Sequence, residues 1–361
     1  MSIKKDKYFI SLANTLARNS LGYTGPNPSV GAVVVKNDDV ISFGSTNYTG
    51  RPHAEVNALN KLSKTDRKNS TIYISLEPCT HYGKTPPCVN TIINSKIKKV
   101  VYSINDADRR TSGKSSRILK SKKIKVKSNL LKSFSKFMYK NYFYTKINDK
   151  PYIYGKLAIS KDFYLKDKKN FYITNKKSLE TAHILRSRVN CILTSSKTIN
   201  DDNPKLNCRL EGLRKFSPCI AILDKHLKIN KSSFLIKNAK NNRTFIFYNS
   251  VNPKKVKFLK SKKLVLIHTP LYNNNLNFDF ILDKLSKYEI SSILVEGGKT
   301  LISSLLNKNY FNEFYLFISS KSLKNRGSSL IKNIKSILST KFKNIKYNET
   351  FLDKDNLIHY Y

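Results

Sequence analysis

One histidine and two cysteines in the first hundred residues constrain this chain more than any other feature. His53 stands in the segment PHAE, Cys79 in EPC and Cys88 in TPPC. One imidazole and two thiolates suit tetrahedral zinc, and three protein ligands leave the fourth position open to water, as in catalytic zinc sites. The pattern therefore predicts a catalytic zinc held by these three residues.

Glu55 lies two residues beyond His53, at the start of a predicted helix, close to the metal without being one of its ligands. This is the arrangement of zinc deaminases, in which a glutamate that does not bind the metal deprotonates water and delivers protons to the ring and to the leaving ammonia. We therefore expect Glu55 to be catalytic. Two alternatives stay open at this point: inert buried cysteines, or a structural zinc with His81 as fourth ligand. In the catalytic interpretation, His81 takes a substrate-side or supporting role.

The charge of the chain raises the question of a nucleic-acid partner. The formal net charge is +43 over 361 residues, and a strongly positive field attracts polyanions. The lysines are spread along the whole chain, however, together with abundant Asn, Ile, Ser and Tyr and no Trp. This pattern favours compositional drift toward A/T-rich codons, so no nucleic-acid partner is expected, although an anionic small substrate would benefit from the field.

Cysteine use and hydropathy indicate a cytoplasmic protein. The five cysteines are scattered rather than arranged as a secreted disulfide framework, which favours a reducing compartment. Polar residues interrupt the apolar stretch near the N-terminus, where Phe9, Leu12, Ala13 and Leu16 follow helical spacing. No apolar run reaches membrane-spanning length, so no membrane association is expected.

Alternating strand-like and helix-like segments predict an α/β protein of two domains. The pattern lapses between Lys140 and Pro151, and a new strand-like run begins at Tyr152; we therefore predict domains at 1–148 and 149–361. The Lys/Asn-rich stretches 225–242 and 252–263 are interpreted as solvated connections or helix faces. Predicted strands are 30–35, 72–75, 100–104, 152–158, 191–195, 219–223, 244–248, 264–267 and 293–295, with helices at 53–62 and 177–188 and after Gly298.

The spacing of the two cysteines narrows the function. Nucleic-acid and nucleoside deaminases usually place two residues between them, whereas eight intervene in this chain. HAE followed by EPCTHYGKTPPC, with GPNPSVGAVVV upstream, resembles the bifunctional deaminase/reductases of riboflavin biosynthesis, and the resemblance extends over nearly the full length. It implies a cytidine-deaminase-like three-layer domain followed by a dihydrofolate-reductase-like α/β domain.

The resemblance also implies substrates and cofactors. The first domain would use Zn²⁺ to deaminate 2,5-diamino-6-(5-phosphoribosylamino)pyrimidin-4-one, a phosphorylated pyrimidine. The second would use NADPH to reduce the ribosyl group to ribityl, giving 5-amino-6-(5-phosphoribitylamino)uracil. In both domains the partner is therefore a small molecule.

Site residues follow from the resemblance position by position. Asn27 and Lys84 would contact the deaminase substrate, although both also lie in ordinary turn sequences. Arg186 and Arg209 would contact the reductase substrate, and the planar fork of arginine suits a sugar phosphate; Arg186 could equally be solvated on a helix face. Leu206 and Glu296 complete the substrate positions, and the cofactor positions are Ala158, Tyr172, Thr198, Asp202, Gly298, Lys299 and Thr300.

The chain departs from the family pattern at several points. Phe163 replaces a glycine, Tyr172 a tryptophan and Asn203 an aspartate, and the segment from Asp106 to Gly113 lacks the prolines of the family. The replacements at 163, 172 and 203 put the cofactor grip of the reductase in doubt, and the missing prolines end the carry-over of residue roles at Asp106. The remaining alternatives are a zinc deaminase acting on tRNA or another polynucleotide, and a nucleic-acid-binding protein with a structural zinc. A homo-oligomer is possible.

Overall fold

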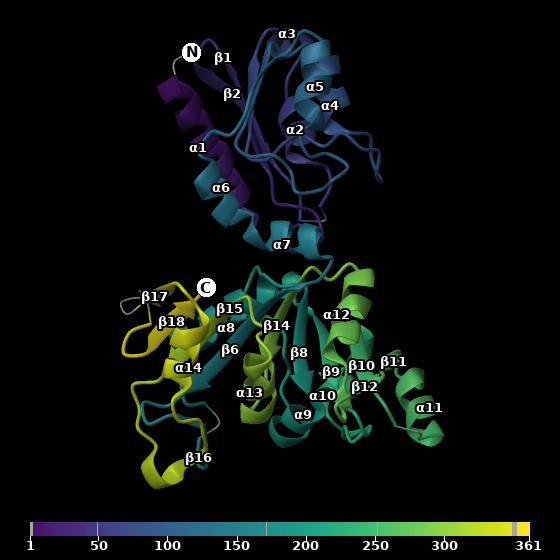
Figure 1. Ribbon diagram of the computed structural model, residues 1–361, viewed down its shortest axis with the longest axis vertical. Helices are drawn as coiled ribbons and strands as arrows, with labels where there is room; N and C mark the ends of the chain where they lie inside the picture. Colours follow the sequence, from purple (N-terminus) through teal and green to yellow (C-terminus); the bar gives the residue numbers. More distant parts are fainter. Residues whose placement is uncertain (1–2, 49, 171, 251, 349–351) are drawn as a thin grey trace. The chain divides into compact units, whose positions relative to one another are not determined.

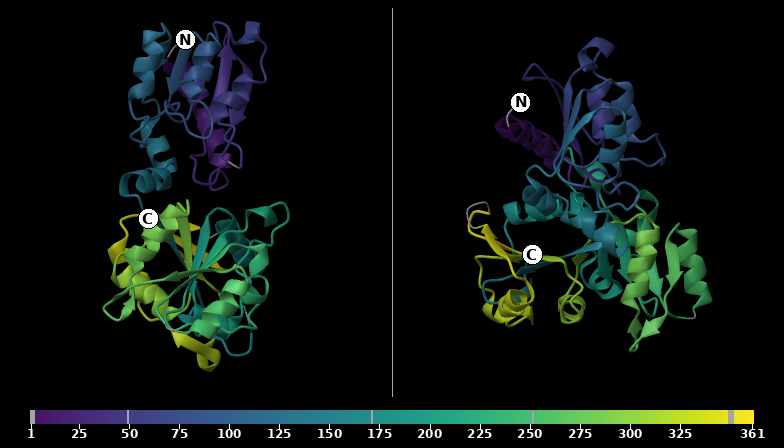
Figure 2. Two further views of the ribbon diagram at one scale, coloured as in Figure 1. Left: turned by 90° about the vertical axis from the view of Figure 1, so that its right-hand side faces the viewer. Right: turned by 45° about the horizontal axis from the view of Figure 1, so that its top comes forward.

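The structure is a computed structural model that describes residues 3–48, 50–170, 172–250, 252–348 and 352–361. Its contacts divide the chain into two compact units, Met1–Lys150 and Pro151–Tyr361, each of which is described by itself (Figures 1 and 2). Within the described ranges, every helix is too short or too polar to cross a membrane.

The N-terminal unit is built on a sheet of five strands: β1 (Gly31–Lys36), β2 (Asp39–Ser45), β3 (Thr71–Ile74), β4 (Lys99–Tyr102) and β5 (Lys125–Lys127). Their order is β2-β1-β3-β4-β5. β1 is antiparallel to both of its neighbours, whereas β3, β4 and β5 run parallel.

Helices cover both faces of this sheet because alternate strand residues point to opposite sides. Val33 and Val35 pack with residues of α1 (Ile3–Asn19), while Ala32 and Val34 pack on the other face. That second face is covered by α2 (Ala54–Leu59), α4 (Cys88–Asn94) and α5 (Lys114–Ser121), and a short α3 spans Lys64–Arg67. The α/β three-layer arrangement expected for this half is confirmed (Figure 1).

The break in regular structure expected between Lys140 and Pro151 is wrong in detail, because most of that segment is helical. α6 (Lys132–Met138) and α7 (Lys140–Asn148) follow β5. They meet at Tyr139, which is fully buried and whose hydroxyl contacts Ser75 Oγ at 2.6 Å. Burial of this aromatic ring stabilises the segment, and α7 ends at Asp149 in the left-handed region (φ +53°).

The C-terminal unit contains a sheet of nine strands in the order β11-β10-β9-β8-β14-β6-β15-β18-β17. All neighbours are parallel except β15–β18 and β18–β17. The strands are β6 (Tyr152–Ile159), β8 (Cys191–Ser195), β9 (Cys219–Leu223), β10 (Thr244–Tyr248), β11 (Val265–His268), β14 (Ser292–Glu296), β15 (Glu313–Ile318), β17 (Ile345–Asn348) and β18 (Asn356–Tyr360). Two small ladders lie outside it, β7 (Tyr164–Asp167) with β16 (Gly327–Leu330) and β12 (Leu271–Tyr272) with β13 (Asn275–Leu276).

Helices also flank this sheet on both faces (Figure 2). Residues such as Leu193 and Val295 face one apolar cluster, and their neighbours Ile192 and Leu294 face another. The Lys/Asn-rich stretches hold the short α10 (Phe234–Lys237) and the helix α11 (Pro253–Ser261). The helices are α8 (Lys176–Ser187), α9 (Ser196–Asp202), α10 (Phe234–Lys237), α11 (Pro253–Ser261), α12 (Phe278–Lys287), α13 (Lys299–Asn307) and α14 (Ile334–Lys341), with single 3-10 turns at Arg214–Phe216, Ala239–Asn241 and Lys324–Arg326.

The central strands of this sheet determine where its site lies. β14 sits between β8 and β6 and runs parallel to both. The carboxyl ends of the three strands therefore meet at one edge, which is where ligands bind in open α/β sheets.

Candidate active sites

The N-terminal unit brings the three predicted metal ligands together. The donor atoms of His53, Cys79 and Cys88 all lie within 4.8 Å of one another. His53 Nδ1 is 3.3 Å from Cys88 Sγ and 3.6 Å from Cys79 Sγ. Tetrahedral zinc, with Zn–N of about 2.0 Å and Zn–S of about 2.3 Å, separates such ligand atoms by about 3.5 Å. The donor set therefore fits zinc in both chemistry and spacing.

Local structure places each of these ligands. His53 caps the N-terminus of α2, Cys79 lies in the turn after β3, and Cys88 is the first residue of α4. The Cys88 backbone N–H donates to Cys79 Sγ at 3.2 Å. Hydrogen bonds from Cys88 and His53 lower the pKa of Cys79 to about 4, despite its burial. Cys79 is therefore a ready thiolate, the form that binds a metal.

Glu55 is positioned by the first turn of α2. Its side chain is buried, and burial raises its pKa to about 7. A carboxyl group with a pKa near neutral pH is suited to take up and release protons. Glu55 does not belong to the group of metal-ligating atoms found among the described residues.

The other predicted residues of this unit lie around the metal group. His81 Nδ1 contacts Thr111 Oγ1 at 3.1 Å, and His81 lies outside the three-residue metal group of the described chain. The position of His81 outside this group argues against a structural zinc with His81 as fourth ligand. Asn27 packs against Gly50, where a Cβ would lie 2.2 Å from Asn27 Nδ2, and Lys84 is exposed in the spacer loop.

In the C-terminal unit, two predicted substrate residues form a buried ion pair. Arg186 Nε and Nη2 donate to Glu296 Oε1 and Oε2 at 2.6 and 2.9 Å. Burial alone would raise the pKa of Glu296, but the adjacent positive charges of Arg186 and Lys156 lower it to about 2. The Arg186 guanidinium is therefore held in one orientation by Glu296, and Arg186 is not a solvated arginine on a helix face.

Lys156 was not among the residues predicted for this site. It lies on β6, and its Nζ is 3.9 Å from Glu296 Oε2. Desolvation lowers the pKa of Lys156. The signal was present in the sequence, because a lysine within a strand of apolar residues needs a buried partner.

The remaining two substrate positions lie near Asn207. Its carbonyl accepts a hydrogen bond from Arg186 Nη1 at 3.4 Å, and its side-chain oxygen accepts one from Arg209 Nη1 at 3.1 Å. The Leu206 side chain packs in the core with only 4% of its surface exposed, and its φ is +46°. Leu206 as a whole residue is therefore buried.

Predicted cofactor residues come from the three central strands and their loops. Ala158 lies near the carboxyl end of β6, Thr198 follows β8, and Gly298 follows β14. Gly298 caps α13 without a side chain, and a Cβ there would meet nothing within 4 Å. The space and the uncapped first-turn N–H groups of Lys299 and Thr300 suit a phosphate.

Two further cofactor positions lie on other segments. Asp202, at the end of α9, accepts a hydrogen bond from Lys166 Nζ on β7 at 2.6 Å. Tyr172 is exposed in the loop that precedes α8.

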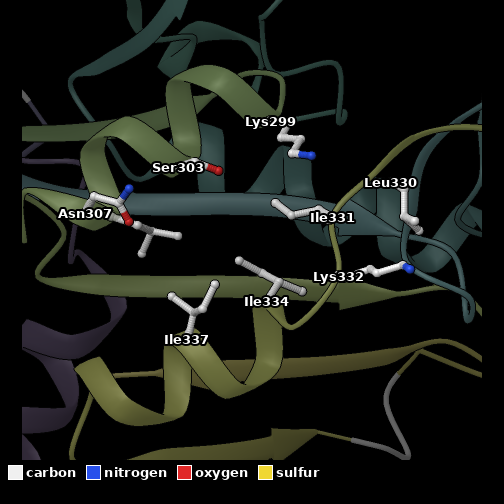
Figure 3. A pocket seen from close by; sticks show the side chains of 9 residues that line it. Lys299, Ser303, Asn307, Leu330, Ile331, Lys332, Ile334 and Ile337 are labelled. Atoms are coloured by element: carbon white, nitrogen blue, oxygen red, sulfur yellow. The ribbon is translucent and has the colours of Figure 1, made fainter.

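A pocket of about 380 Å³ lies between α13 and the segment Leu330–Ile337 (Figure 3). Lys299, Ser303 and Asn307 line one side of it, and apolar side chains including Ile334 line the other. Of the predicted cofactor residues, its lining includes only Lys299.

Comparison with known proteins accounts for both units. Residues 3–104 match the cytidine and deoxycytidylate deaminase zinc-binding region, and residues 151–348 match the RibD C-terminal domain. The riboflavin biosynthesis protein RibD of Aquifex aeolicus is 34% identical over 88% of this chain and 87% of its own length, and that of Escherichia coli is 28% identical over 88% and 89%.

Solved structures agree with these matches. The chain resembles Acinetobacter baumannii RibD with a TM-score of 0.84 at 25% identity, covering 99% of both chains. It also resembles a diaminohydroxyphosphoribosylaminopyrimidine deaminase/5-amino-6-(5-phosphoribosylamino)uracil reductase from Thermotoga maritima, with a TM-score of 0.80 at 28% identity over 99% and 98%.

These matches favour neither the polynucleotide deaminase nor the nucleic-acid-binding alternative. They agree with the metal group of the first unit and the reductase-like sheet of the second. The chain belongs to the RibD family of riboflavin biosynthesis proteins, bifunctional enzymes that combine a zinc-dependent deaminase with an NADPH-dependent reductase.

Proposed function

We propose that residues 1–148 deaminate 2,5-diamino-6-(5-phosphoribosylamino)pyrimidin-4-one and that residues 149–361 reduce the ribosyl group of the product. The observation that carries this proposal is the buried Glu55 beside a His/Cys/Cys group in a chain whose two halves match the two RibD activities. The final product would be 5-amino-6-(5-phosphoribitylamino)uracil.

For the deaminase, we assign His53, Cys79 and Cys88 as the metal ligands and Glu55 as the proton carrier. Zinc, when bound, lowers the pKa of a water molecule and so supplies the nucleophile. Glu55 carries two protons in turn: one from that water to the ring nitrogen, and then one from the hydroxyl formed on the ring carbon to the leaving amine, which departs as ammonia while the carbonyl forms. Its burial supports this role, because a pKa of about 7 allows both steps near neutral pH.

Around this centre, we assign Asn27 and Lys84 to substrate binding. Asn27 packs beside Gly50, close in sequence to His53. Lys84 lies in the exposed spacer loop between Cys79 and Cys88, where a cation would attract an anionic substrate.

For the reductase, we assign Arg186, Leu206, Arg209 and Glu296 to the substrate. NADPH supplies the hydride. The Glu296 carboxylate holds the guanidinium of Arg186 in one orientation, which prepares its remaining donors for a phosphate or a sugar hydroxyl. We assign the cofactor to Ala158, Tyr172, Thr198, Asp202, Gly298, Lys299 and Thr300, most of which lie at the edge where β8, β14 and β6 end.

A two-step assay tests this proposal. Zinc-loaded protein mixed with the diaminopyrimidine ribotide should release ammonia, and NADPH should then be oxidised in equal amount. No ammonia from protein with a full zinc content would refute the deaminase assignment. A cytoplasmic location and a homo-oligomeric assembly stay predictions from the sequence.

A further inference from the structure

The loop that follows β4 is fastened to the turn that carries Cys79. Glu77, two residues before Cys79, is buried, and its carboxylate accepts backbone N–H groups from Asp106 at 3.1 Å, Gly113 at 2.9 Å and Ser115 at 3.1 Å. The Ser115 hydroxyl also donates to it at 2.8 Å. Such charge-assisted hydrogen bonds from several points fix the position of a loop.

A second set of contacts ties the middle of the same loop to the residues just after Cys79. Thr80 Oγ1 donates to the carbonyl of Arg110 at 2.9 Å, and His81 contacts the Thr111 hydroxyl. The backbone of Arg110 is therefore held beside the metal-bearing turn.

Within this loop, Asp108 orients the guanidinium of Arg110. Nε and Nη2 of Arg110 donate to Oδ1 and Oδ2 of Asp108 at 2.9 and 2.6 Å. The Asp108 side chain is only 8% exposed, and Lys146 Nζ approaches its Oδ2 at 3.2 Å. Two cations thus lie beside the Asp108 carboxylate, and Asp106 Oδ1 accepts the backbone N–H of Asp108 at 2.9 Å in the same loop.

The pairing with Asp108 uses only some of the N–H donors of the Arg110 guanidinium. A guanidinium has five N–H donors, and Asp108 takes two of them. Nη1 makes no hydrogen bond to the part of the chain that the structure describes, and the Arg110 side chain is 59% exposed. The open edge between Nη1 and Nη2 can therefore form the paired hydrogen bonds with which arginine binds phosphate.

We propose that Arg110, held by Asp108, binds the phosphate of the ribotide at the rim of the deaminase site. This inference rests on the proposed deaminase function, which requires a phosphorylated substrate. A ribotide whose ring lies at the metal extends its sugar phosphate away from it, toward the rim. Arg109, the next residue, is exposed, and no contact within the described chain fixes it.

Substitution of Arg110 tests the proposal, with Arg109 as the matched control. Arg110→Ala should raise KM for the ribotide by about tenfold to a hundredfold, the loss expected for charge-assisted hydrogen bonds, with zinc content and kcat little changed. The KM of Arg110→Lys should lie between those of the wild type and Arg110→Ala, because lysine keeps the charge but lacks the planar pair of N–H donors. Arg109→Ala should change KM less than about twofold, since an unfixed exposed charge contributes little.

Ribose 5-phosphate identifies the group that Arg110 contacts. It should inhibit ammonia release competitively in the wild-type protein and in Arg109→Ala, and much more weakly in Arg110→Ala. An unchanged inhibition constant in Arg110→Ala, an equal effect of the two substitutions, or no inhibition of the wild type would each overturn the proposal. Absence of ammonia release from the zinc-loaded wild type would instead refute the proposed function, so the two failures are distinguishable.

Discussion

Replacing Glu296 by glutamine should destabilise the C-terminal unit by about 3 kcal/mol at neutral pH. In the native chain, the pKa of Glu296 is lowered from 4.5 to about 2. Each pKa unit corresponds to about 1.4 kcal/mol, so the native ion pairs favour the charged form by about 3 kcal/mol. The independent expectation for breaking a buried ion pair is about 3–5 kcal/mol, because the cations left behind remain buried.

The sign of the pH dependence follows from the direction of this pKa change. A carboxyl group whose pKa is lower in the folded state stabilises the fold fully above about pH 4.5, and this contribution is lost as the pH falls toward 2. The difference between wild type and Glu296→Gln should therefore be about 1.4 kcal/mol smaller at pH 3.5 than at pH 7.

Urea unfolding followed by hydrogen exchange of peptides spanning β14 measures this difference in the C-terminal unit. Glu211→Gln is the matched control, because Glu211 is exposed and makes no ion pair within the described chain. A difference below about 0.5 kcal/mol at pH 7 would refute the reasoning, since that is the range of ordinary surface substitutions. A difference in unfolding free energy that does not change with pH would also refute the reasoning.

Three other predictions concern separate parts of the chain. Glu55→Gln should retain zinc and lose ammonia release by about 10²–10⁴-fold, because proton transfer is removed; metal analysis and an ammonia assay check this, and retained activity would contradict the assignment. Asp202→Ala should raise KM for NADPH without altering ammonia release, and a parallel loss of both activities would argue against independent sites. Asp6→Asn should destabilise the N-terminal unit by about 3 kcal/mol, since the buried Asp6 carboxylate pairs with Lys99 and Lys127; an unchanged urea midpoint of that unit would show that the cations find other partners.

The parts of the fold that could be predicted are those with a strong local signal. β8, β9 and β10 have the predicted bounds, because parallel strands buried on both faces are short, uninterrupted apolar runs. The metal group was predictable for a different reason. Few chemistries explain one His, two Cys and a nearby Glu in this order, and the structure brings the three ligands together.

The parts that could not be predicted depend on contacts between distant residues. Arg186 and Glu296 are 110 positions apart, and nothing local to either one indicates their pairing. Nothing in the local sequence around Glu77 indicates its partners either. Its carboxylate oxygens accept hydrogen bonds from the backbone of a loop about thirty residues further on. α7 was missed because none of its own residues is fully buried, so it has little periodic signal.

The order of strands in the C-terminal sheet has a consequence for synthesis of the chain. β6 and β8 are the first two strands of this sheet to be made, but β14, which separates them in the sheet, is made about a hundred residues after β8. Until residue 296 has been made, β8 is paired only with β9, and β6 has neither of its partners, β14 and β15. Unpaired strand edges promote association with other chains, and pairings that span long sequence distances form slowly. A nascent chain that pauses before residue 292 should therefore be the form of this protein that depends most on chaperones.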